Sequence, residues 1–130
     1  MPGNYEQYRK FYQDVSGSLI LGTGTDDSTL VTVRNANHTL YLQKAHVQIT
    51  GASAGKTWQL TDSAATPVQL TGPFATDTDG THFDMDFGPV GVPLTEGKNL
   101  LLDLSATGAA GVVTWEGYQK LTATTAVGSL

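Results

Sequence analysis

The chain has 130 residues, a formal net charge of −5 and no cysteine. This length is that of one domain, and the lack of cysteine excludes disulfides, thiolate metal sites and cysteine nucleophiles. The seven Lys and Arg residues are scattered along the chain, which disfavours direct nucleic-acid binding because phosphate contacts need clustered basic residues. The polar start lacks a secretory-signal pattern and no apolar run approaches a membrane span, so we expect a soluble chain that binds no membrane.

The first patterned segment, residues 4–15, differs in periodicity from everything after it. Aromatic and apolar residues recur there at helical spacing, at Tyr5, Tyr8, Tyr12 and Val15. Asn4 precedes Gln7 in the order of a capping box. The pattern predicts a short amphipathic helix or an ordered arm within an N-terminal segment that we bound at residues 1–17.

The aromatic side chains of this segment are candidate partner contacts. They are Tyr5, Tyr8, Phe11 and Tyr12. So many aromatic rings are not expected to remain in water. They either cap the core of their own domain or pack on another subunit, and both alternatives stay open at this stage.

From Ser18 onward the hydrophobic period changes from 3.6 to 2, which indicates β-strands. We expect strands near 18–22, 29–34, 39–50, 56–62, 67–71, 82–87, 99–105 and 111–121, separated by clusters of Gly, Pro, Asp and Ser. About eight strands without a further helix predict an all-β fold, an antiparallel β-sandwich of jelly-roll type, over residues 18–121. The uncharged residues 122–130 are expected to form a flexible tail or an arm that becomes ordered only on a partner.

Two of the expected strands have apolar patterns that depart from simple alternation. The apolar set Leu40 and Leu42 changes phase before Ala45, Val47 and Ile49. One extra residue near 43–44 would explain this, either as a β-bulge or as a corner where the strand changes sheet. Residues 100–104 are apolar on both faces for part of their length, as in a central strand or one covered by a neighbouring subunit. Leu101 is therefore a further candidate partner contact.

One acidic turn is the weak candidate for a cation site. Asp77 and Asp79 precede Gly80 in the order that opens a calcium loop. Asp-Gly between two strands is equally the signal of a hairpin turn. We expect no other metal site and no cofactor.

No group of residues in the sequence predicts an active site, so we expect no enzyme. The histidines, His38, His46 and His82, form no metal-binding doublet and adjoin no nucleophile motif, which favours structural or surface roles. Asp84 and Asp86 alternate with apolar residues and lie side by side on one strand face. Glycosidase carboxylates must instead flank a substrate cleft.

The large aromatics of the later chain leave a sugar-binding alternative. Trp58 keeps phase with Leu60, and Trp115 with Val113, which favours core positions. Tyr118 is out of phase with Trp115 and is the better surface candidate. If exposed, Trp115 and Tyr118 are the residues that could stack a sugar.

The stretch from Leu94 to Gln119, LTEGKNLLLDLSATGAAGVVTWEGYQ, preceded by VQITGASAGKTW from Val47 to Trp58, resembles small virion proteins of tailed bacteriophages. Within that group it is most similar to capsid decoration, or cement, proteins. The resemblance implies a β-sandwich, commonly a homotrimer, that is made in the host cytoplasm and sits on the outer capsid surface of the virion. It implies the major capsid protein as partner, a stabilising role and no catalytic residues.

Two other functions stay open beside this one. The first is a carbohydrate-binding β-sandwich used for adhesion to the host surface. The second is a tail or head-completion subunit, which would share the fold and the terminal arms but form rings of different symmetry.

Overall fold

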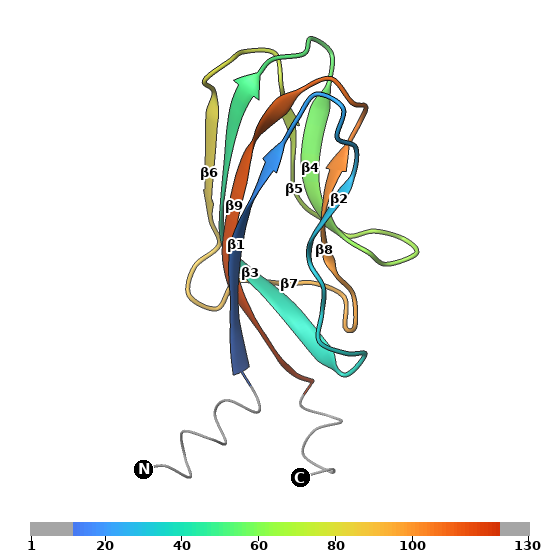
Figure 1. Ribbon diagram of the computed structural model, residues 1–130. Coiled ribbons are helices and arrows are strands. Elements are labelled where there is room, and N and C mark those ends of the chain that lie inside the picture. The colour runs from blue at the N-terminus through green and yellow to red at the C-terminus, as the bar shows by residue number, and fades with distance from the viewer. Residues whose placement is uncertain (1–11, 123–130) are drawn as a thin grey trace.

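The computed structural model describes residues 12–122, which form nine strands in two antiparallel sheets (Figure 1). The strands are β1 (Tyr12–Leu21), β2 (Ser28–Val31), β3 (His38–Gly51), β4 (Thr57–Asp62), β5 (Gln69–Ala75), β6 (His82–Asp86), β7 (Val92–Pro93), β8 (Leu100–Leu104) and β9 (Ala110–Leu121). The described residues contain no helix, and hence none that is long and apolar enough to cross a membrane. The predicted all-β sandwich is confirmed.

The strand order is that of a jelly roll. Sheet A has the order β1-β9-β3-β6, with the short β7 also paired to β3, and sheet B has the order β2-β8-β4-β5. The antiparallel pairs β4 with β5, β3 with β6, β2 with β8 and β1 with β9 are nested one inside the next. A long hairpin rolled into two facing sheets produces this nesting, which is the topology that the spacing of the predicted strands indicated.

The core lies between the two sheets and follows from the alternation of apolar residues. Fully or almost fully buried side chains include Leu21, Leu40, Leu42, Val47, Ile49, Trp58, Leu60, Leu102 and Val113. Trp58 and Leu60 alternate with half-buried Thr57 and Gln59 on β4, as predicted. Each large apolar side chain buried in this way contributes about 1.5–3 kcal/mol before ordering costs.

The phase change in β3 is a β-bulge. Leu42 lies opposite Gly117 and Lys44 lies opposite Glu116, so Gln43 has no partner position on β9. The extra residue restores the inward direction of Ala45, which is buried. The predicted bulge is confirmed, and the alternative of a corner between sheets is not realised, since β3 pairs with β9 on both sides of Gln43.

Strand β8 is a central strand of sheet B, between β2 and β4. Leu100, Leu102 and Leu104 are buried in the core, whereas Leu101 is half-buried on the outer face. The central position therefore explains why Leu101, on the outer face, is apolar as well, although Asp103 stands on that face too.

The helix alternative of the N-terminal prediction is wrong for residues 12–15, the part of this segment that the structure describes. Residues 12–15, part of the predicted helix, belong to strand β1, so the sandwich begins before the predicted boundary at 18. The spacing of Tyr12 and Val15 suits a helix, but Val15, Leu19 and Leu21 also alternate with period 2, and pairing with β9 along the whole strand favours that pattern. Residues 4–11 of the predicted helix and 123–130 of the predicted tail lie outside the described residues.

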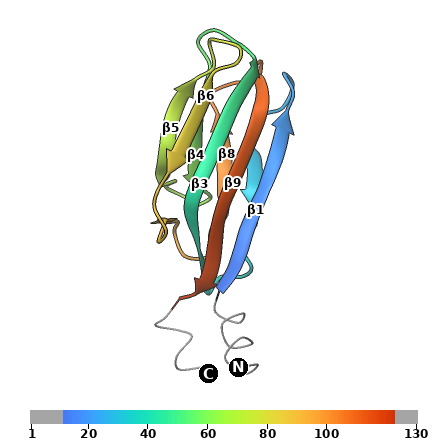
Figure 2. The same cartoon turned by 90° about the vertical axis from the view of Figure 1, so that its left-hand side faces the viewer.

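The described chain begins and ends at the same end of the sandwich. Tyr12 lies opposite Lys120 on neighbouring strands β1 and β9. Both views show this end at the bottom, and Figure 2 shows sheet A from its outer side, with β1 at one edge and β6 at the other (Figures 1 and 2). Any contacts made by the two terminal segments therefore start from neighbouring points.

Candidate functional site

The outer face of sheet A brings together two histidines and a carboxylate. His46 on β3 lies directly opposite Asp84 on β6, and Gln48 lies opposite His82, so the two histidines are diagonal neighbours. His46 Nδ1 is hydrogen-bonded to the Asp84 carboxylate, and His46 Nε2 lies 3.3 Å from His82 Nδ1. The side chains of His46 and Asp84 are 35% and 80% exposed. The sequence predicted surface or structural histidines but could not predict that these two would meet.

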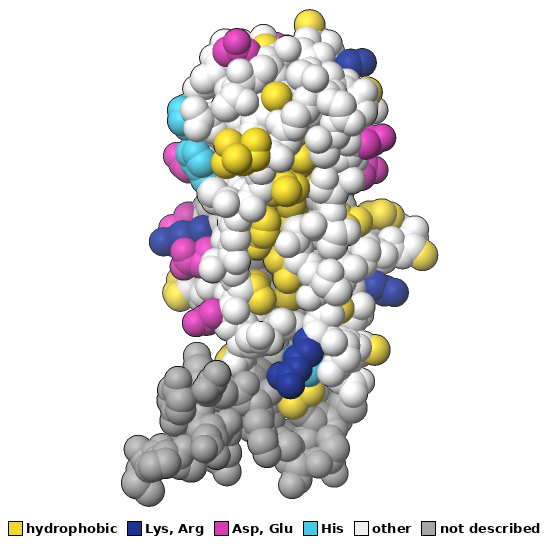
Figure 3. Space-filling model, in the orientation of Figure 1, with side chains coloured by type: hydrophobic (Ala, Val, Ile, Leu, Met, Phe, Trp, Pro, Cys, Tyr) yellow, Lys and Arg dark blue, Asp and Glu magenta, His cyan; other side chains and the backbone are white. Residues whose placement is uncertain are grey.

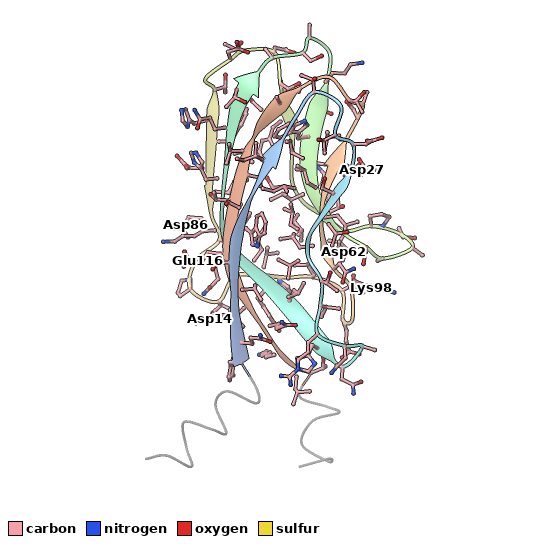
Figure 4. All side chains as sticks on the ribbon, in the orientation of Figure 1. Asp14, Asp27, Asp62, Asp86, Lys98 and Glu116 are labelled. Atoms are coloured by element: carbon pink, nitrogen blue, oxygen red, sulfur yellow. The ribbon has the colours of Figure 1, made fainter. Side chains whose placement is uncertain are left out.

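A shallow hollow of about 450 Å³ adjoins this cluster on the same face. Its charged lining is Lys44, Asp84, Asp86 and Glu116. The predicted same-face position of Asp84 and Asp86 is confirmed, since both lie opposite outward-facing residues of β3. In Figure 3, His and acidic side chains gather along the β6 side of the molecule, and Figure 4 labels Asp86 and Glu116 there. The hollow is open to solvent, and its lining combines these charged side chains with apolar ones.

Tyr118 lies on the outer face of sheet A, as predicted. Its ring stacks on Tyr41 with centroids 4.8 Å apart and an interplanar angle of 6°. The Tyr118 hydroxyl donates a 2.7 Å hydrogen bond to the carbonyl of Val90, and Lys120 Nζ lies 5.0 Å from the Tyr41 ring centroid. Partial burial raises the pKa of Tyr118, and the Lys120 charge opposes that shift.

Trp115 does not join Tyr118 in a ligand site. Its indole faces the inner side of sheet A, packs against the core and covers Gly17, where an added Cβ would lie 2.7 Å from the ring. The buried Nε1 of Trp115 has no hydrogen-bond partner among the described residues. The two candidate sugar-stacking residues therefore lie on opposite faces of β9.

The acidic turn has a structural explanation. Asp79 Oδ1 accepts a 2.5 Å hydrogen bond from the backbone N–H of Ala52, and Asp77 Oδ1 accepts one of 3.2 Å from Gly55. These bonds join the β5–β6 connection to the β3–β4 connection. Within residues 12–122 no three His, Cys, Asp or Glu side chains are placed to hold a metal ion together.

Asp62 is a buried carboxylate whose oxygens are fully used by the fold. Oδ1 accepts hydrogen bonds from the backbone of Ala64 (3.1 Å) and Val68 (3.0 Å). Oδ2 accepts bonds from the backbone N–H (3.0 Å) and the hydroxyl (2.6 Å) of Thr95. Burial alone would raise the pKa of Asp62, but these hydrogen bonds outweigh it and hold the pKa below its ordinary value. The residue fixes the projecting β4–β5 loop, at whose base it is labelled in Figure 4.

The third histidine is part of the structure rather than of a site. His38 is buried, and its Nδ1 lies 2.7 Å from Asn35 Oδ1. Burial, assisted by the Arg34 charge, lowers the pKa of His38. The contact between His38 and Asn35 lies in the connection between β2 and β3.

The candidate partner contacts do not form one surface. Tyr12 is 38% exposed on the outer side of β1 in sheet A, whereas half-buried Leu101 lies on the outer side of sheet B. Tyr5, Tyr8 and Phe11 lie outside the described residues. The candidates can therefore contact one partner together only if that partner reaches around the sandwich.

Strand β1 is an open edge that the sequence reasoning missed. Among the described residues it pairs only with β9, over ten consecutive positions without a bulge. It contains no Lys, Arg or Pro, and Ile20 is 79% exposed. Beside it, Val15, Val31 and Trp115 line a narrow apolar crevice, and Figure 3 shows apolar side chains down the middle of this view. The absence of Lys and Pro from residues 12–21 was the available signal.

Comparisons with known proteins do not assign this chain to a family. No family model matches the sequence, and no curated protein matches it. The structure is similar to that of infectious bursal disease virus Gt strain, with 14% identity over 82% of this chain and 30% of that chain, at a TM-score of 0.38. The VP2 subviral particle of the same virus gives 11% identity over 85% and 40% of the two chains, at a TM-score of 0.31. This chain thus spans less than half of those chains, and at these TM-scores the likeness carries no argument about function.

Proposed function

We propose that this chain is a non-enzymatic virion structural protein that decorates a tailed-phage capsid and stabilises it by bridging major capsid protein subunits. We further propose that it acts as a homotrimer on the outer capsid surface and is made in the host cytoplasm. The observation that carries the proposal is the open edge of sheet A at β1. The sequence resemblance and the jelly-roll fold, which viral capsid domains share with lectins and cupins, agree with it.

An open edge strand is a surface for subunit contact. Its outward N–H and C=O groups form a row that can pair with another chain, and soluble proteins protect such rows with short strands, Lys, Pro or bulges. The ten residues of β1 contain none of these protections and include only one charged residue, Asp14. We therefore assign β1 to a contact with a second copy or with a capsid neighbour.

The positions of the chain ends support a bridging role. Residues 1–11, with their aromatic side chains, precede β1 directly, and residues 123–130 follow Thr122 at the same end of the sandwich. Tyr12 and Lys120, near which these segments start, lie on the neighbouring strands β1 and β9, beside the β1 edge. In a symmetric assembly each contact is repeated in every subunit.

Cementing a capsid needs buried area rather than chemistry. Each large apolar side chain that becomes buried on a neighbour contributes about 1.5–3 kcal/mol, from which the cost of ordering the contact is subtracted. Repeated over all copies on a shell, such contacts would oppose the outward pressure of packaged DNA without any direct contact with nucleic acid.

The proposal is tested on capsids prepared with and without this chain. Decorated capsids are expected to withstand heat and low salt that disrupt bare ones, and the Ile20→Lys chain is expected to give less protection. Val90→Lys is the matched control, because Val90 is also an exposed β-branched residue, 69% exposed, but lies away from β1. Bare capsids that are as resistant as decorated ones would contradict the proposal.

One observation favours a second candidate, a carbohydrate-binding sandwich. The Tyr41–Tyr118 stack lies on the outer face of sheet A beside the acidic side chains of Asp14 and Glu116. Aromatic faces with polar neighbours can stack sugar rings. A glycan array on which the full chain binds no sugar would remove this candidate. A ring of six or twelve copies in solution would instead favour the tail or head-completion subunit.

A further inference from the structure

We propose that His46 and His82 form a binding site for a divalent transition-metal ion of the zinc, nickel and copper class on the outer face of sheet A. This site is independent of the proposed capsid role. It rests on the positions of three side chains from the adjacent strands β3 and β6.

The separation of the two ring nitrogens is that of two ligands on one metal ion. Nitrogen ligands lie about 2.0–2.1 Å from zinc, so two of them at a tetrahedral angle are about 3.3 Å apart. His46 Nε2 and His82 Nδ1 are 3.3 Å apart and share a hydrogen bond, which a bound ion would replace. The diagonal arrangement across antiparallel strands produces this distance without a change in the backbone.

Asp84 prepares His46 for metal binding. When the carboxylate accepts a hydrogen bond from Nδ1–H of His46, the lone pair of that ring lies on Nε2, which faces His82. A carboxylate that orients a histidine in this way is the usual support of a histidine ligand and raises its basicity. Asp84 therefore acts as a positioning residue, on the side of the ring away from the ion.

The surroundings favour a cation and limit its affinity. Asp86 lies on the same face, opposite Lys44, next to the His46–Asp84 pair. No third His, Cys, Asp or Glu of residues 12–122 completes the set, so water fills the remaining positions. Two imidazoles favour zinc, nickel or copper over calcium and magnesium, which prefer oxygen ligands.

The test is calorimetric titration of the untagged full chain with zinc chloride and nickel chloride at neutral pH. We expect one site that saturates at one ion per chain, and no binding of calcium chloride. His46→Ala and His82→Ala are each expected to abolish the site. Asp84→Asn is expected to weaken binding about tenfold.

Two controls separate this site from general charge effects and from misfolding. Glu116→Gln makes the same charge change as Asp84→Asn on the same face and is expected to leave the affinity unchanged. Thermal melting of each variant without metal reports its fold, and we expect melting temperatures close to that of the unmodified chain because all three side chains are on the surface. No zinc or nickel binding by the unmodified chain, or unchanged binding by folded His46→Ala and His82→Ala variants, would overturn the proposal.

Discussion

The two edges of sheet A are built differently. At one edge, β1 presents ten residues in unbroken register with β9 and only one charged side chain. At the other, β6 has five residues, of which Asp84 and Asp86 face outward, and β7 adds two residues that end in Pro93. Short strands, charge and proline protect an edge against pairing, so among residues 12–122 the β6–β7 edge carries such protection and the β1 edge does not. This difference is the basis on which we propose assembly through β1 and ligand binding at β6.

A charge on the unprotected edge has the largest expected effect. Ile20→Lys replaces the most exposed large apolar side chain of β1 with an ammonium group, which pairing with another chain would have to desolvate. We expect the variant to sediment as a monomer, with a stability within about 0.5 kcal/mol of the unmodified chain. Val90→Lys should retain the assembly, and loss of assembly in both variants would remove the special role of β1.

Removing the protection from the second edge should make it resemble the first. Asp84→Val combined with Asp86→Val replaces both carboxylates on the outer side of β6 with apolar side chains and leaves His82 as the polar residue of that side. We expect this double variant to form larger species as its concentration rises, measured by light scattering. Species no larger than those of the unmodified chain at the same concentrations would contradict the claim that these carboxylates protect the edge.

A variant in sheet B, Asp62→Ala, tests the folding stability of the chain rather than its assembly. Asp62→Ala leaves the donors of Ala64, Val68 and Thr95 without their acceptor, which should cost about 1–3 kcal/mol in the free energy of unfolding. Because the folded pKa of Asp62 lies below the ordinary 3.8, its contribution is complete above that pH and is lost as the pH falls through the folded value. Urea unfolding should therefore show a difference at pH 7 that shrinks below pH 3.8, and a pH-independent difference would contradict this.

The smallest expected effect is on the β6–β7 connection, at the protected edge of sheet A. Tyr118→Phe removes the hydrogen bond to the Val90 carbonyl, which holds the β6–β7 connection against sheet A. We expect a loss of about 0.5–1.5 kcal/mol in unfolding free energy and no change in assembly. A change in oligomeric mass would instead place this face in the subunit contact.

The sequence allowed correct predictions where the alternation of apolar residues within one strand indicates which side of that strand is buried. Alternation predicted the inward side of β4 and β6, and the phase change at Gln43 predicted the bulge. At residues 12–15 a helical spacing coincided with a period-2 pattern, and only pairing with β9 decides between them.

The candidate sites depend on information that one strand does not contain. His46 and Asp84 meet because β3 and β6 pair in one particular register, which no local pattern specifies. The open edge also depends on strand order, since β1 would be protected if another strand lay beside it. Both features therefore became visible only in the folded arrangement.

The most direct test of the central claim, that this chain assembles through its β1 edge, is the solution mass of the full chain compared with that of its Ile20→Lys variant, which should be the mass of a monomer. Light scattering after size-exclusion chromatography should give about 41 kDa for a trimer of the 13.7 kDa chain, maintained on dilution. A mass of 13.7 kDa at every concentration would contradict self-assembly through this edge.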